Sequence, residues 1–419
     1  MNKFRILIIG LIFFISNSYP QKASLQDLID IALQLSPELK MYEAKTRASE
    51  NRIQQNTNLP DPMLSFGVMD LPVPSLSFNR DMMTQKVVGL SQEFPFPGML
   101  SAKEDVNRKE VEIVKQEYND KRNEIIKDLT QSYYELIYIR NEIELTEKSR
   151  QLMKQILDVV RSMYSVADAS QQNVFRVELE LTKMSEMIAA LKSEEAEQLS
   201  AINSLLLRDP ATEIETDSLP QFSFARLNVD DLISKAEANR PYLRGIQIAE
   251  EKEKLNQSVA EYDFYPMFRL SAQYAFREDL QPDGMPQDNM ISVMLDISLP
   301  LNYGGKVSAM VEETKSMQEM YREQYSASVQ MLKREFGMAV AKLNSLKNRI
   351  ELVEQGSLIQ AKENFNSALA SYQVGEIDFM NVIEAQNNLY TIEKNLYRLK
   401  TDYLKQIAEL EFLTGMKIE

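Results

Sequence analysis

The chain has 419 residues, with 47 basic and 62 acidic side chains and a formal net charge of -15. This acidic balance argues against nucleic acid as a partner, because the phosphate backbone requires a positively charged surface. The chain has no His and no Cys, so it lacks imidazole and thiolate ligands, thiol nucleophiles and the usual general base, and we expect no enzymatic activity and no cofactor.

The first 18 residues have the pattern of a secretory signal peptide. Lys3 and Arg5 precede an apolar run over residues 6–15, and Ser16 and Ser18 supply small residues at the cleavage site. The alternative is a membrane anchor, but the run is shorter than the roughly 20 residues that a spanning helix needs. No Cys follows the run, so we do not expect a lipidated amino terminus.

Residues 19–210 form the first of two predicted structural repeats. Apolar residues at spacings of three and four predict a helix from Ser24, its cap, to about Asn58. A β-hairpin is predicted over residues 61–97, where apolar and small or polar residues alternate on both sides of a polar loop. Strands of about ten residues are long enough to cross a membrane in a tilted barrel.

A long helix is predicted next, over residues 99–164, which contain no Pro or Gly and have Arg140 at one apolar seam position. At 1.5 Å per residue its length would be about 97 Å. A helix that long must pack laterally against partners, as in a coiled coil or a helical barrel. A turn then leads to a return helix over residues 171–207.

After a linker at residues 211–228, the same series is predicted again over residues 229–419. This second repeat comprises a helix, a β-hairpin at 265–301, a long helix at 306–371 and a return helix at 379–414. The offset between the copies is about 204 to 208 residues, which indicates one duplicated unit. Two hairpins supply four strands per chain, too few to close a barrel alone.

Strict alternation in the second hairpin predicts one apolar and one polar sheet face. We expect the apolar face to contact lipid and the polar face to line a lumen, in a barrel built from several chains. The alternative is a soluble sandwich, because alternation also marks a half-buried sheet. The residues predicted to face lipid are Phe268, Leu270, Tyr274, Phe276, Ile291, Val293, Leu295 and Ile297.

The chain resembles the TolC-type outer-membrane efflux proteins across essentially all of its mature length. The resemblance is carried by the duplicated order of elements, by QEFPFPG after the second strand, and by Tyr372-x-x-Gly375 followed by Asn381-Val382-Ile383-x-Ala385-Gln386. The stretch LPDPMLSFG is similar to the metal-cation branch of that family.

This resemblance implies a mainly α-helical fold with a membrane β-barrel portion. Three chains would each give four strands to a 12-stranded β-barrel in outer-membrane lipid, and their long helical hairpins would form a periplasmic α-barrel. The partners implied are a periplasmic adaptor protein and an inner-membrane pump of the RND or ABC type.

The two turns between the long and return helices are the predicted periplasmic tips. Gly375 can take a left-handed conformation that ends a helix, and Asp378 is placed to cap the next one. The resemblance puts the adaptor-facing tips at Val374, Gly375 and Glu376 and, in the first copy, at Val166, Ala167 and Asp168. It puts the periplasmic constriction at Tyr372, Asn381 and Glu384.

Asn381 replaces the acidic residue of the family pattern, so Glu384 alone keeps that charge. A ring of three Glu384 carboxylates would favour cations at a narrow pore; the alternative is an ordinary solvated helix charge. The 22 Met residues could suit soft metals, but their scatter is typical of apolar filling, and we expect no metal site. Acidic pairs such as Glu250 and Glu251 are interpreted as a solvated helix face.

The sequence thus predicts a passive outer-membrane export duct for small molecules or metal cations, docked to an adaptor and a pump. Two alternatives remain. One is the outer-membrane duct of a type I protein secretion system, which would use the same architecture. The other is a periplasmic coiled-coil scaffold, whose strand pairs would be buried in a soluble domain.

Overall fold

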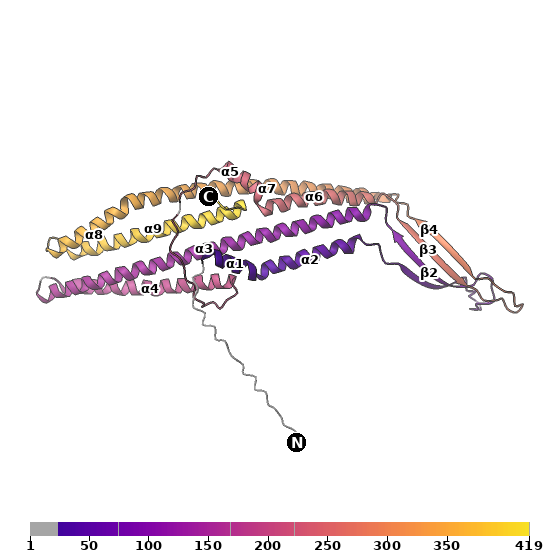
Figure 1. Cartoon of the computed structure of the whole chain (residues 1–419), viewed down its shortest axis with the longest axis horizontal. Coiled ribbons are helices and arrows are strands. Elements are labelled where there is room, and N and C mark those ends of the chain that lie inside the picture. The colour runs from indigo at the N-terminus through magenta and orange to yellow at the C-terminus, as the bar shows by residue number, and fades with distance from the viewer. Residues whose placement is uncertain (1–23, 74, 168, 222, 419) are drawn as a thin grey trace, which may run out of the picture.

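The computed structural model describes residues 24–418 except 74, 168 and 222. The predicted signal peptide and Asp168 therefore lie outside the described residues. The rest of the chain forms a long helical body with a sheet at one end (Figure 1). The predicted fold class, mainly helical with four strands, is confirmed.

Both halves contain their elements in the same order. The first half consists of α1 (Leu25–Leu35), α2 (Pro37–Thr57), β1 (Met63–Met69), β2 (Gln85–Phe94), α3 (Met99–Ser165) and α4 (Gln171–Leu205). The second half consists of α5 (Val229–Asn239), α6 (Pro241–Tyr262), β3 (Phe268–Phe276), β4 (Met290–Ile297), α7 (Lys306–Leu352), α8 (Leu358–Gln373) and α9 (Phe379–Thr414).

The first helix of each half is broken once, so the prediction of one helix from Ser24 to about Asn58 is wrong. Pro37 follows Ser36, whose ψ is 119°, because a residue before proline is disfavoured in the α region. Ser36 instead caps α2 by accepting the Leu39 N–H at 3.3 Å. Arg240 and Pro241 repeat the break in the second half, whereas the predicted Ser24 cap is confirmed.

The long helix of the first half is continuous, and its counterpart in the second half is not. Helix α3 has 67 residues and spans about 100 Å. Its counterpart contains a π-helical turn, Val353–Ser357, between α7 and α8. Gly356 lies in this turn and has a low helix propensity, so the predicted uninterrupted second helix is corrected to two α-helices joined by a π turn.

The four strands form one antiparallel sheet in the order β1-β2-β3-β4. The β2–β3 pairing, from Lys86↔Phe276 to Phe94↔Phe268, joins the two halves. Within the described residues the strands pack mainly on one another, without a second layer over either face. All residues of β1 and β4 are exposed in the single chain, so the sheet is not part of a sandwich.

Three apolar clusters hold the helices together. Two of them lie in the bodies of the two halves and are centred on residues such as Leu129 and Phe336. The third joins α3 and α4 to α8 and α9 near the turns, through Val160, Phe365 and Phe379 among others. The two helical hairpins consequently run together towards the end of the molecule opposite the sheet (Figure 1). None of the helices in the described part of the chain has an apolar stretch suited to crossing a bilayer.

Candidate functional site

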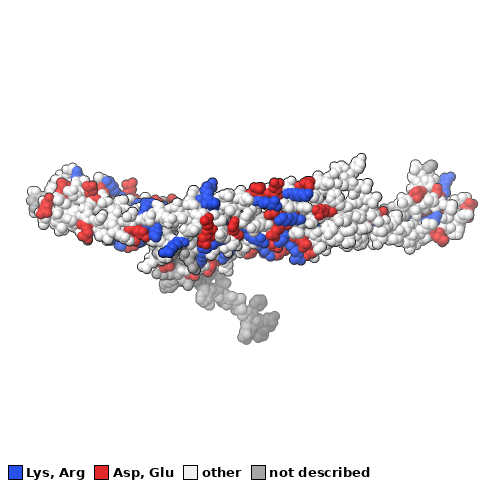
Figure 2. All heavy atoms as spheres, turned by 90° about the horizontal axis from the view of Figure 1, so that it is seen from above, with Lys and Arg blue, Asp and Glu red and all other residues white. Residues whose placement is uncertain are grey.

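One face of the sheet is apolar except near its two ends, where Lys86 and Gln92 of β2 lie on it. Strand register aligns Phe66, Val88, Tyr274 and Ile291 in one row across all four strands. Alternation along the strands puts all eight residues that were predicted to contact lipid on this same face. Figure 2 shows, over this part of the molecule, a band almost free of charged residues between the charged helical body and the charged loop end.

The opposite face of the sheet carries most of the polar groups. Glu93, Arg269 and Asp296 form one row, and the Arg269 guanidinium pairs with the Glu93 carboxylate. Ser91 and Ser271 form the corresponding row nearer the loops. The sheet thus has the two unlike surfaces that a wall between lipid and water requires.

The two turns at the far ends of the helical hairpins have similar backbones. The φ of Gly375 is 76°, and that of Ala167 is 63°, so both residues are left-handed. Asp378 accepts the Met380 N–H at 2.8 Å, which confirms the predicted cap of α9.

The tips expose apolar as well as polar side chains. Val374 and Val166 are 69% and 67% exposed, and Glu376 is also exposed. The two tips thus offer exposed apolar side chains beside polar ones to the surroundings.

The three predicted constriction residues do not share one environment. Asn381 and Glu384 are exposed and lie three residues apart on α9, which puts them on one helix face. Tyr372 is buried, with its ring 5.1 Å from that of Phe379. Its hydroxyl has no hydrogen-bond partner among the described residues, and burial raises the pKa of this phenol. The exposed part of the predicted constriction is therefore Asn381 with Glu384.

Charged groups that the sequence interpretation missed join α3 to α9. Glu135 accepts hydrogen bonds from Arg398 at 2.6 Å and Lys405 at 2.7 Å. Although burial raises the pKa of Glu135, these two cations hold it below its ordinary value. About two turns further along α3, the buried Glu142 pairs with Lys394 of α9. Glu135 and Glu142 lie among the apolar residues of α3, and this position was the signal in the sequence that they would need cationic partners.

Arg140, which interrupts an apolar seam of α3, holds the predicted linker against the helices. Its guanidinium donates to Glu195 at 2.7 Å and to the Ile214 carbonyl at 2.6 Å. The Ile214 side chain is buried, so the predicted linker is anchored on the helices along its first part. Arg140 therefore fixes the start of the crossing between the halves.

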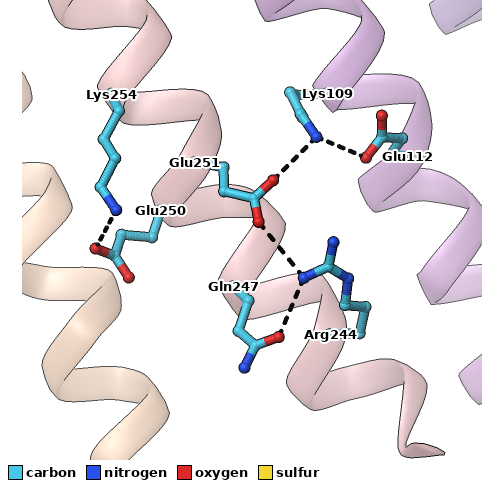
Figure 3. Close-up of polar contacts among 7 residues, drawn as sticks. All are labelled: Lys109, Glu112, Arg244, Gln247, Glu250, Glu251 and Lys254. Atoms are coloured by element: carbon cyan, nitrogen blue, oxygen red, sulfur yellow. Dashed lines mark hydrogen bonds and ion pairs between the residues drawn. The ribbon is translucent and has the colours of Figure 1, made fainter. Parts of the chain in front are cut away.

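Glu250 and Glu251 are ion-paired, which corrects their interpretation as a solvated helix face. Glu251 contacts Lys109 of α3 at 2.9 Å, and Glu250 contacts Lys254 at 3.0 Å (Figure 3). Glu250 also contacts Arg322 of α7 at 3.3 Å. The hydrogen bond from Lys254 lowers the pKa of Glu250, and that from Lys109 lowers the pKa of Glu251. The two carboxylates thus link α6 to a different helix on each side.

No group of three or more carboxylates that could hold a metal ion is found among residues 24–418, positions 74, 168 and 222 aside.

Comparison with known proteins agrees with this geometry. Residues 232–416 match the family model described as outer membrane efflux protein. The outer membrane efflux protein BepC of Brucella suis is 20% identical over 307 residues, covering 71% of this chain and 64% of that protein. The cobalt-zinc-cadmium resistance protein CzcC of Cupriavidus metallidurans is 21% identical over 392 residues, covering 89% and 86%.

The fold is also that of a solved outer-membrane protein. VceC of Vibrio cholerae superposes with a TM-score of 0.77 at 18% identity, covering 94% of this chain and 97% of that one. At 18% identity this similarity supports a shared fold and nothing more specific.

Proposed function

We propose that three copies form a passive export duct across the outer membrane, which the match of residues 232–416 to the outer membrane efflux protein model supports. Each copy gives its four strands to a 12-stranded barrel and its helical hairpins to a tunnel in the periplasm. The duct performs no chemistry of its own, and its transport energy comes from a partner pump.

One observation carries this proposal: an uncovered sheet, mainly apolar on one face and mainly polar on the other, lies at the end of a helical body whose longest helix, α3, spans about 100 Å. Within the described residues its edge strands β1 and β4 are each paired on one side only. An exposed edge is a template for another strand. Closure with neighbouring copies removes these edges and turns the polar face towards a lumen.

The tips supply the contact with the rest of the machinery. Exposed Val374 and Val166, with Gly375, Glu376, Ala167 and Asp168, form the surface that a periplasmic adaptor grips, and the adaptor in turn binds the inner-membrane pump. The cargo is small molecules or metal cations; the printed name of one relative, a cobalt-zinc-cadmium resistance protein, favours cations.

Fractionation followed by bilayer recording tests the duct. The full chain should be recovered with the outer membrane as a trimer, and the purified trimer should give discrete conductance steps in planar bilayers. Recovery as a soluble periplasmic protein would sink the proposal, since it is the outcome that a coiled-coil scaffold predicts.

Glu384 is the proposed source of cation preference at the constriction, with Asn381 beside it and Tyr372 supporting the turn from within. Replacing Glu384→Gln should reduce the cation preference measured from reversal potentials, because a ring of three carboxylates is removed. Glu393→Gln, on the same helix but paired with Lys362, is the control. Unchanged selectivity in Glu384→Gln would remove this residue from the filter.

A further inference from the structure

All four methionines of the described strands lie on the polar face of the sheet. Met63 and Met294 end the row that contains Ser91 and Ser271. Met290 lies on the same face, four residues before Met294. Met69, six residues after Met63, lies there too. The other face contains no methionine in these strands; apart from Lys86 and Gln92 it uses Leu, Ile, Val, Phe, Tyr and Ala.

This distribution is the reverse of what apolar filling predicts. A methionine used as filler belongs in a core or against lipid. Here the four side chains are 66%, 45%, 51% and 52% exposed, for Met63, Met69, Met290 and Met294 in turn. They share their face with the charged row of Glu93, Arg269 and Asp296.

Contacts with polar side chains show the direction of two of the four sulfur atoms, those of Met69 and Met290. The Gln273 side-chain amide donates to the Met69 Sδ at 3.3 Å. An Arg277 guanidinium N–H approaches the Met290 Sδ at 3.9 Å. Both donors belong to polar-face residues, so these thioether sulfurs lie in the same space as the polar groups and are available as acceptors.

The methionines also lie on the two strands that form the edges of the sheet, β1 and β4. In a closed barrel β4 of one copy runs beside β1 of the next, at the ordinary spacing of about 4.8 Å. Each seam then gathers methionines from two copies, and no single chain can assemble this group.

We propose that these seams bind soft monovalent cations of the Cu(I) and Ag(I) class through thioether sulfur as the ions pass along the lumen. Thioethers select soft ions and need no deprotonation to bind them. A row of neutral, weak ligands retains an ion briefly and releases it, as conduction requires. This inference rests on the proposed function, because it takes the polar face as the lumen.

Silver binding to the purified trimer tests the proposal. Equilibrium dialysis against silver nitrate in chloride-free buffer should show silver bound to the wild type and lost from a variant carrying Met63→Leu, Met69→Leu, Met290→Leu and Met294→Leu. Leucine keeps the apolar volume and removes the sulfur. The matched control replaces four exposed helix methionines, Met41, Met320, Met331 and Met338, by leucine and should retain the silver.

Equal silver binding by the strand variant and the wild type would overturn the inference, as would an equal loss in the helix control. If the full variant does not assemble, the half variants Met63→Leu with Met69→Leu, and Met290→Leu with Met294→Leu, each remove one side of every seam and should each lose silver. A trimer that conducts ions but whose silver binding does not depend on the strand methionines contradicts this inference alone. A chain that never forms trimers contradicts the proposed duct as well.

Discussion

Ala167 occupies a backbone conformation that its counterpart Gly375 adopts at lower cost. Both residues have positive φ, 63° and 76°, and a residue with a Cβ is disfavoured there by roughly 1–2 kcal/mol. A Cβ built on Gly375 meets nothing within 4 Å, so only the backbone conformation would oppose a side chain at that tip.

Reciprocal substitutions at the two tips should therefore act in opposite directions. We expect Ala167→Gly to slow amide hydrogen exchange around the first turn, and Gly375→Ala to speed exchange around the second, each by about 1 kcal/mol in local opening free energy. Hydrogen–deuterium exchange of the tip peptides measures both. Faster exchange in Ala167→Gly would contradict the strain argument.

Gly375 and Asp378 were predictable because turn chemistry is local: glycine favours a left-handed turn and aspartate caps the next helix. The burial of Tyr372 was not, since it depends on packing against Phe379 across the turn. Glu250 and Glu251 were misjudged for the same reason. Their partners Lys109 and Arg322 lie far away in sequence.

At the scale of elements, α9 forms ion pairs of very different burial with α3 and with the π turn Val353–Ser357. Glu142 is 3% exposed and pairs with Lys394, whereas Glu354 and Lys400 are 40% and 31% exposed and lie 2.5 Å apart. Removing the partner of a buried carboxylate leaves an uncompensated charge, while exposed pairs contribute little.

Lys394→Met should accordingly destabilise the helical body by about 3 kcal/mol, and Lys400→Met by less than about 1 kcal/mol. Thermal or denaturant unfolding followed by circular dichroism compares the two variants on the same helix. Similar losses in both would show that the burial of Glu142 does not determine the strength of its pair.

Glu135 makes the contact between α3 and α9 sensitive to acid. Burial raises the pKa of this carboxyl, but Lys405 and Arg398 lower it further, so the folded-state pKa lies below the ordinary 4.5. A carboxyl with a lowered pKa contributes stability that is present above its unfolded pKa and lost as the pH falls through the folded one.

We therefore expect the wild type to lose stability as the pH drops below 4.5, and Glu135→Gln to lose less over the same range. Unfolding curves collected between neutral pH and pH 3 give the comparison. An identical pH dependence in the two proteins would exclude Glu135 as a contributor.

Helix periodicity predicted the long helices well, because each element carries its own apolar stripe. The breaks at Ser36 and Arg240 were missed, although the signal is local: a proline follows each of these residues and disfavours the α conformation there. The π turn at Val353–Ser357 was not predictable in this way, since a helical period continues through it.

At the scale of the whole molecule, the sheet is complete only as part of an assembly. Its inner strands β2 and β3 are paired on both sides, and its outer strands β1 and β4 on one side only. Duplication could be read from the sequence. The pairing of the two hairpins into one sheet could not, because β2 and β3 are about 180 residues apart and their register depends on the tertiary fold.

The absence of cysteine makes disulfide cross-linking of the sheet edges the most direct measurement. Phe66→Cys on β1 can be combined in turn with Ile291→Cys, Val293→Cys and Leu295→Cys on β4, which samples the register between copies. Phe66→Cys with Val88→Cys, directly paired within one chain, is the intramolecular control. After oxidation in outer membranes, at least one edge pair should give covalent dimers and trimers on denaturing gels; monomers from every edge pair, with the control fully oxidised, would contradict the trimeric barrel.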